Sequence, residues 1–159
     1  MQRNRLEKIV VSVGVGKMRQ NQQFEEKILP VIIEELALIT GQKAAPRGAK
    51  KSIAGFKSRE GDIIGLTTTL RGKRMEDFLK RLVNISLPRV RDFRGIDLKH
   101  FDDRGNLTIG FREHTVFPEI NAETSKANFG LQVTLVSDAK TKEEGVAFFR
   151  DLGLPIKSK

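Results

Sequence analysis

Several stretches of this chain alternate apolar residues with polar or small ones, and this alternation limits what the chain can fold into. In residues 6–15, for example, Ile9, Val11 and Val13 recur at every second position. A period of two places such residues on one face of a β-strand and the intervening residues on the other face. We therefore predict strands over residues 6–15, 63–70, 107–112 and 130–137.

Three other stretches repeat apolar residues at the spacing of a helix. The first covers residues 24–39, and Pro30 should kink this helix or mark its first turn. The second follows the strand at 63–70 and is expected to end at Pro88. The third opens with the capping-box pattern Thr141-Lys-Glu-Glu144. Residues 42–61 contain glycine, proline and many basic residues, and they are expected to form a loop.

Strands with one apolar and one polar face favour an α+β fold, because parallel strands in α/β folds are usually buried on both faces. We predict a two-layer sandwich, in which a mostly antiparallel sheet has helices packed on one face. A length of 159 residues suits a single domain, which we expect to cover residues 1–159. The second face of the sheet should be polar and should carry Ser12, Thr67, Thr69, Gln132 and Thr134.

The positive charge of the chain is concentrated in one stretch. Residues 43–94 hold 14 Lys and Arg against 5 Asp and Glu, which equals the net charge of +9 for the whole chain. A dense cationic stretch attracts polyanions, because each basic group that meets a phosphate releases a condensed counterion. This pattern indicates nucleic acid as the first candidate partner and a membrane surface as the second.

The first basic group precedes the strand at 63–70, in a segment that also contains glycine and serine. Small residues let the main chain approach phosphates closely, while long basic side chains reach them. The alternative is a solvated loop that keeps the protein soluble. Six basic residues come before the first acidic one, Glu60, and this favours phosphate binding: Lys43, Arg47, Lys50, Lys51, Lys57 and Arg59.

The second basic group lies in and after the second predicted helix. Arginine dominates after Pro88, and its planar guanidinium can fork onto a phosphate or stack on a base. Part of the group has a structural alternative, because Asp77 and Arg81 have the i,i+4 spacing of a helical ion pair, as do Glu76 and Lys80. Arginines around Asp92 could equally form a local ion-pair network. The group contains Arg71, Lys73, Arg74, Lys80, Arg81, Arg89, Arg91 and Arg94.

The sequence gives little support for a metal, nucleotide-binding or catalytic site. The chain has no cysteine, which excludes disulfides and thiolate zinc sites. Val13-Gly-Val-Gly-Lys17 lacks the spacing of a P-loop. Asp102-Asp103 could ligate a metal, but Asp-Asp-Arg-Gly-Asn is typical of a hairpin turn. His100 and His114 have no nucleophile near them in sequence and are interpreted as residues of polar loops. We expect no catalytic residue, cofactor or metal.

Two further observations concern location and binding mode. No apolar run approaches the ~20 residues of a membrane span, and the N-terminus lacks the apolar region of a secretory signal, so an intracellular protein is expected. The chain has ten Phe but no Tyr or Trp, and Phe24, Phe78 and Phe149 lie in helical apolar stripes. Base stacking needs exposed aromatic rings, so we expect RNA contacts through backbone and shape.

Several segments together resemble the large-subunit ribosomal protein L5 family. They occur in the family's order and cover most of the chain, and the block that begins at Leu87 is long enough to be highly specific. The segments are Arg5-Leu-Glu-Lys-Ile-Val-Val, Val13-Gly-Val-Gly16, Lys50-Lys-Ser-Ile-Ala-Gly-Phe-Lys-Ser-Arg-Glu-Gly61, Thr69-Leu-Arg-Gly-Lys-Arg-Met75, Leu87-Pro-Arg-Val-Arg-Asp-Phe-Arg-Gly95, Phe101-Asp-Asp-Arg-Gly-Asn106 and Val116-Phe-Pro-Glu-Ile120.

The resemblance implies a non-enzymatic protein that binds 5S rRNA in the central protuberance. It also implies contacts with 23S-type rRNA, P-site tRNA, neighbouring central-protuberance proteins and a small-subunit head protein across an intersubunit bridge. No membrane partner is implied. The expected location is the cytoplasmic ribosome of a bacterium or, alternatively, a mitochondrial or plastid ribosome.

Resemblance and charge together select the candidate site residues. Those expected to contact rRNA lie in the predicted strands, in the basic loop and in the second basic group. They are Lys8, Ser12, Lys43, Arg47, Lys50, Lys51, Thr69, Arg71, Lys73, Arg89 and Arg91. The segment that matches the family's tRNA-facing loop supplies the candidates for tRNA, which are Phe56, Lys57, Ser58 and Arg59.

The sequence departs from the family pattern in two places. The family has an N-terminal helical segment before the stretch that matches Met1 onwards, and this sequence begins at that Met. Residues 121–129 differ from the family's Asp-Tyr-Asp-Lys-Val continuation, so the resemblance assigns no intersubunit-bridge residues in this stretch. Two other functions also stay open: a free RNA-binding regulator or chaperone, and a small nuclease or phosphotransferase that uses Asp102, Asp103 and a histidine.

Overall fold

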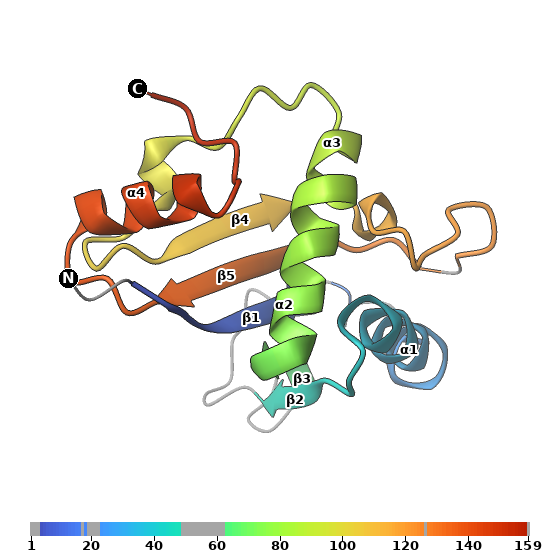
Figure 1. The fold of residues 1–159 in the computed structure, drawn as a ribbon. Helices are drawn as coiled ribbons and strands as arrows, with labels where there is room; N and C mark the ends of the chain where they lie inside the picture. Colours follow the sequence, from blue (N-terminus) through green and yellow to red (C-terminus); the bar gives the residue numbers. More distant parts are fainter. Residues whose placement is uncertain (1–3, 17, 19–22, 49–62, 126, 159) are drawn as a thin grey trace.

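A computed structural model describes residues 4–16, 18, 23–48, 63–125 and 127–158. Five strands form one sheet in the order β2-β3-β1-β5-β4, and each neighbouring pair is antiparallel (Figure 1). The strands are β1 (Leu6–Gly14), β2 (Ala45–Gly48), β3 (Ile63–Leu70), β4 (Leu107–Phe111) and β5 (Leu131–Ser137).

The helices form a second layer on one face of the sheet (Figure 1). A π-helical turn, Phe24–Ile28, leads into α1 (Leu29–Thr40), and α2 (Gly72–Arg81) continues through the π-helical turn Leu82–Ser86 into α3 (Leu87–Arg89). The last helix is α4 (Lys142–Asp151), and short 3-10 turns cover Leu98–His100 and His114–Val116. This arrangement confirms the predicted α+β sandwich. Among the described helices, none is long and apolar enough to span a membrane.

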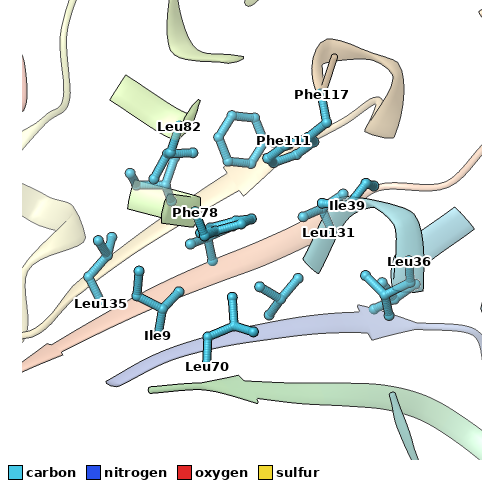
Figure 2. Close-up of a cluster of buried hydrophobic side chains, with 14 of the residues drawn as sticks. Ile9, Leu36, Ile39, Leu70, Phe78, Leu82, Phe111, Phe117, Leu131 and Leu135 are labelled. Carbon is cyan, nitrogen blue, oxygen red and sulfur yellow. The ribbon is translucent and has the colours of Figure 1, made fainter. Parts of the chain in front are cut away.

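The core lies between the two layers and is built by the predicted apolar faces. Ile9, Val11 and Val13 of β1 are buried, as expected from their alternation. Figure 2 shows Phe78 and Leu82 of the long helical run lying over the sheet. The aromatic rings are part of this packing, since the ring of Phe78 stacks on that of Phe117 with centroids 5.8 Å apart.

Three local predictions need correction. Ala45–Gly48, expected to be loop, is an edge strand paired with β3, and an edge position tolerates Pro46 because one side of the strand is unpaired. Pro88 does not end the second helix, because it occupies the first turn of α3 and the helical run continues to Arg89. Arg81 forms its ion pair with Glu119 and not with Asp77, whose main-chain carbonyl it contacts instead.

Candidate nucleic-acid interface

The sheet face away from the helices, called here the open face, carries the polar side chains predicted for it. Ser12 of β1 pairs with Thr67 of β3 on one side and with Gln132 of β5 on the other. Thr134 pairs with Thr108 of β4, and their hydroxyl oxygens are 3.3 Å apart. Ser12, Thr67, Thr69, Gln132 and Thr134 are all at least partly exposed. The open face therefore presents hydroxyl and amide groups across four strands.

A row of three glycines with an arginine at each end crosses the open face. Gly65 of β3 pairs with Arg47 of β2 and with Gly14 of β1. Continuing the β1–β5 register to the end of β1 places Gly130 beside Gly14, and continuing the β4–β5 register places Arg112 beside Gly130. We call these five residues the glycine row. Strands in a sheet are ~4.8 Å apart, so the main chains of the two outer residues are separated by about 19 Å.

The glycine row forms the floor of a hollow on the open face. The hollow has a volume of about 770 Å³ and is lined by residues of all five strands or of the turns next to them. Besides the glycine row, its lining includes Ser12, Thr67, Gly110 and Gln132. Within the described part of the chain, none of the lining residues is acidic. The hollow thus combines exposed main chain, small polar side chains and two guanidinium groups.

Basic side chains also lie around the margin of the open face. Lys8 follows the alternation of Ser12 along β1 and lies on the same face. Arg71 is exposed directly after β3, and Lys43 is exposed two residues before the start of β2. Gln42 fixes the start of β2, because its Nε2 donates to the carbonyl oxygen of Thr69 at 2.7 Å.

Four basic residues of the margin and of the glycine row have no acidic partner among the described residues. Lys43, Arg47, Arg71 and Arg112 form no ion pair with another described residue. Their charges therefore remain available to an external anion. Together with Lys8 they make a basic rim around the polar open face.

The structure brings together some of the candidate residues and separates others. Lys8, Ser12, Lys43, Arg47, Thr69 and Arg71 lie on or beside the open face. Lys73 is exposed in the first turn of α2, in the helix layer. Arg89 ends α3 in the helix layer, and Arg91 lies two residues beyond the end of that helix. Lys50, Lys51 and the tRNA candidates Phe56, Lys57, Ser58 and Arg59 lie outside the described residues.

Arg112 is the residue of this surface that our reading of the sequence missed. It is a single arginine outside the two dense basic groups, so local charge density does not mark it. The alternation in residues 107–112 does carry the signal, because it places Arg112 on the same face as Thr108 and Gly110. The strand order and register, which bring Arg112 into line with Gly130, Gly14 and Gly65, come only from the structure.

The Asp102 carboxylate accepts hydrogen bonds within the turn before β4 and thereby stabilises that turn. Its Oδ1 accepts hydrogen bonds from the main-chain N–H groups of Arg104 and Asn106, at 2.9 and 2.8 Å, and its Oδ2 accepts from Nδ2 of Asn106. Burial by itself raises the pKa of Asp102, but the donors of Asn106 and Arg104 outweigh it and hold the pKa below its ordinary value of 3.8. No group of three or more His, Cys, Asp or Glu among the described residues could hold a metal ion.

His114 was predicted to lie in a polar loop, and this prediction is wrong. The side chain is fully buried. Its Nε2 lies 2.7 Å from Oε2 of Glu35 and 3.2 Å from Oγ of Ser125. A hydrolytic triad needs the acid and the serine on opposite ring nitrogens. Here both face Nε2, and Nδ1 has no hydrogen-bond partner in the described part of the chain. The three residues therefore form a structural cluster.

Comparisons with known proteins identify related chains over nearly the whole length. Residues 1–59 match the family described as ribosomal protein L5, and residues 63–156 match the model of that ribosomal family's C-terminus. The large ribosomal subunit protein uL5 of Desulfatibacillum aliphaticivorans is 52% identical, over 99% of this chain and 86% of the relative. The protein of the same name from Geobacter sulfurreducens is 50% identical with the same coverage. That from Halothermothrix orenii is 48% identical, over 96% of this chain and 83% of the relative.

Proposed function

The chain belongs to the ribosomal protein L5 family, and from this premise we propose that it is a structural protein of the large ribosomal subunit that binds 5S rRNA through its open face. The observation that carries the proposal is the combination of a polar sheet face with a rim of unpaired basic residues. Ribose hydroxyls and phosphates are the groups that such a surface recognises. The bacterial source of the relatives supports a bacterial cytoplasmic ribosome as its location.

The contacts proposed on this surface follow from the geometry of its side chains. Arg47 and Arg112 stand at opposite ends of the glycine row, where each guanidinium can fork onto a phosphate. Ser12 and Gln132 lie on adjacent positions of neighbouring strands and offer donors to ribose and phosphate oxygens. The seven buried phenylalanines are in the core, and only Phe93 and Phe148 among the described ones are partly exposed, which supports recognition without base stacking.

Other partners are proposed from the family resemblance together with the charge of named segments. Lys50 and Lys51 would extend the 5S rRNA surface, because their segment follows the basic edge strand β2 in the sequence and precedes β3. Phe56, Lys57, Ser58 and Arg59 would face P-site tRNA. Lys73 and Arg89, in the helix layer, and Arg91 just after α3 would meet 23S-type rRNA or the neighbouring proteins of the central protuberance. A bridge to a small-subunit head protein is proposed for the region after Asn106, and the protein needs no catalytic group or cofactor for any of these roles.

Binding of the purified chain to 5S rRNA and to a size-matched control RNA, across a salt series, tests this proposal. We expect the preference for 5S rRNA to persist at high salt, because a shape-specific contact includes more than counterion release. Equal binding to both RNAs that collapses with salt would contradict the 5S role. That result would favour the alternative function, a free RNA-binding regulator or chaperone that uses the same surface.

The division between rRNA and tRNA contacts has its own test. Arg59→Glu should leave the affinity for 5S rRNA unchanged and impair P-site tRNA binding to ribosomes that contain the variant. A selective loss of 5S rRNA binding by this variant would contradict the division.

A further inference from the structure

Two glycines on the open face have no role in the fold that the structure reveals. Gly14 ends β1, and Gly110 lies inside β4. Neither has a positive φ. Apart from its own residue and chain neighbours, a Cβ atom built on either of them would meet no heavy atom of the described residues within 4 Å. Neither backbone conformation nor internal packing therefore requires glycine at these two positions.

Other glycines of the sheet differ in this respect. A Cβ at Gly130 would lie 2.8 Å from the carbonyl oxygen of Phe111, and one at Gly65 would lie 3.3 Å from that of Val13. Close packing within the chain therefore explains those two. Glycine inside a strand is destabilising relative to alanine, because it loses more conformational freedom on folding and contributes no side chain. Gly14 and Gly110 thus carry a cost that no described neighbour offsets.

Both unexplained glycines line the same hollow. They lie beside the hydroxyl and amide side chains of Ser12, Thr67 and Gln132, and Arg47 and Arg112 stand at the hollow's two ends. A glycine within a strand often marks a place where a ligand or another backbone approaches the main chain closely. The surroundings indicate the chemistry of that ligand, since the described lining residues supply hydrogen-bond donors and positive charge and none of them is acidic.

We propose that the ribose–phosphate backbone of one RNA strand lies in this hollow, in van der Waals contact with the main chain at Gly14 and Gly110. The inference rests on the proposed function and adds a steric requirement to it. Arg47 and Arg112 hold phosphates at the two ends, while the small side chains between them contact riboses. An acidic polypeptide segment is the competing occupant, but repeated phosphates match two arginines at opposite ends of one trough better.

The steric requirement has a definite size. A methyl group stands about 1.5 Å from Cα, the length of a carbon–carbon single bond. At a surface where the RNA backbone touches the glycine Cα, that methyl displaces the strand by a comparable distance. Phosphate contacts at both ends of the hollow then lengthen together. Alanine at these positions should therefore weaken binding although it removes no contact.

The test uses the full chain with Gly14→Ala, Gly110→Ala and the double variant. Thermal unfolding should show stability equal to or above that of the original chain, because each Cβ enters open space and alanine restricts the unfolded state. Affinity for 5S rRNA at fixed salt should fall at least tenfold in the double variant, and further with Gly14→Val. Ser158→Thr, which adds one methyl to an exposed residue of the C-terminal tail, is the matched control and should bind normally.

Unchanged 5S rRNA affinity in the folded double variant would overturn the inference. Arg47→Glu with Arg112→Glu separates this failure from failure of the proposed function. If that charge-reversed variant loses 5S rRNA binding while the alanine variants do not, the open face binds RNA without close approach at the glycines. If the alanine variants bind 5S rRNA normally but fail to enter ribosomal particles, the hollow holds a polypeptide, and the inference is likewise wrong.

Discussion

Nε2 of His114 lies 2.7 Å from Oε2 of Glu35, although the two residues are 79 positions apart in the sequence. Glu35 projects from α1, and its Oε1 accepts a hydrogen bond from Oγ of Ser125 at 2.7 Å. The ring of His114 also stacks on that of Phe129, with centroids 3.9 Å apart. These contacts connect the segment between β4 and β5 to helix α1. The cluster includes part of residues 121–129, where the sequence departs from the family pattern.

Removing the acidic member of this cluster should destabilise the fold. Glu35→Ala leaves the buried Nε2 of His114 and the hydroxyl of Ser125 without their carboxylate acceptor. We expect the free energy of unfolding to fall by about 1–3 kcal/mol, because two hydrogen bonds to Glu35 are lost, although the Ser125 hydroxyl still donates to the carbonyl oxygen of Ala127. Chemical denaturation measures the change.

Glu34→Ala is the control for that substitution, because Glu34 is the exposed neighbour on the same helix. Its effect should stay within about 0.5 kcal/mol, as for most surface substitutions. A double-mutant cycle with His114→Ala should give a coupling energy of about 0.5–3 kcal/mol. Equal effects of Glu34→Ala and Glu35→Ala would show that the cluster contributes nothing to stability.

A second prediction concerns the contact between α4 and the turn before β4. A Cβ at Gly145 would lie 2.3 Å from Cα of Gly105, which is main chain and cannot move aside easily. Gly145→Ala should therefore lower the free energy of unfolding by about 1–3 kcal/mol, as overpacking does, even though alanine is intrinsically the better helix former. Glu143→Ala in the same helix is the control. A stabilised Gly145→Ala variant would show that the two segments can separate without cost.

The pH dependence of stability should carry a contribution from Asp102. Its folded pKa is lowered, because the donors of Asn106 and Arg104 favour the carboxylate. The stabilisation is therefore fully present above the unfolded value near 3.8 and is lost as the pH falls through the folded pKa. Asp102→Ala should destabilise the protein at neutral pH, and its deficit should shrink below pH 3.8. A deficit that stays constant down to about pH 2 would contradict this account.

The two arginines of the glycine row should account for part of the salt dependence of RNA binding. Each phosphate contact contributes about 0.7 to the log–log salt slope for single strands and about 0.9 for duplexes. Arg47→Ala with Arg112→Ala should reduce the magnitude of the slope for 5S rRNA by about 1.4–1.8. Lys80→Ala with Lys99→Ala is the matched control, since both lysines are exposed and neither lies in the sheet. Equal reductions by the two pairs would remove the special role of the glycine row.

Much of the fold could be predicted because alternation determines the two faces of a strand without knowledge of its partners. Ile9 and Val11 had to be buried together, and Ser12 had to face the other way. The edge strand β2 could not be predicted, since Ala45–Gly48 has no apolar alternation, all four residues are exposed, and the pairing with β3 alone defines it.

The candidate site was predictable where neighbours in sequence share a property and not where the fold gathers distant residues. Lys43 and Arg47 belong to a dense basic stretch, whereas Arg112 reaches the same surface only through the register of β4 on β5. The burial of His114 was missed for a similar reason. Its neighbours Glu113 and Thr115 are polar, and its partner Glu35 lies on a helix far away in sequence.

The absence of cysteine from the chain allows the most direct test of the central claim, that the open face binds 5S rRNA. Three variants each carry a single cysteine. Thr67→Cys and Thr108→Cys report on the open face, and Asn84→Cys reports on the exposed side of the helix layer. The rate of thiol labelling is measured for each variant with and without 5S rRNA. The account predicts that 5S rRNA slows labelling at the two open-face positions and leaves Asn84→Cys unchanged; slower labelling at Asn84→Cys alone would contradict it.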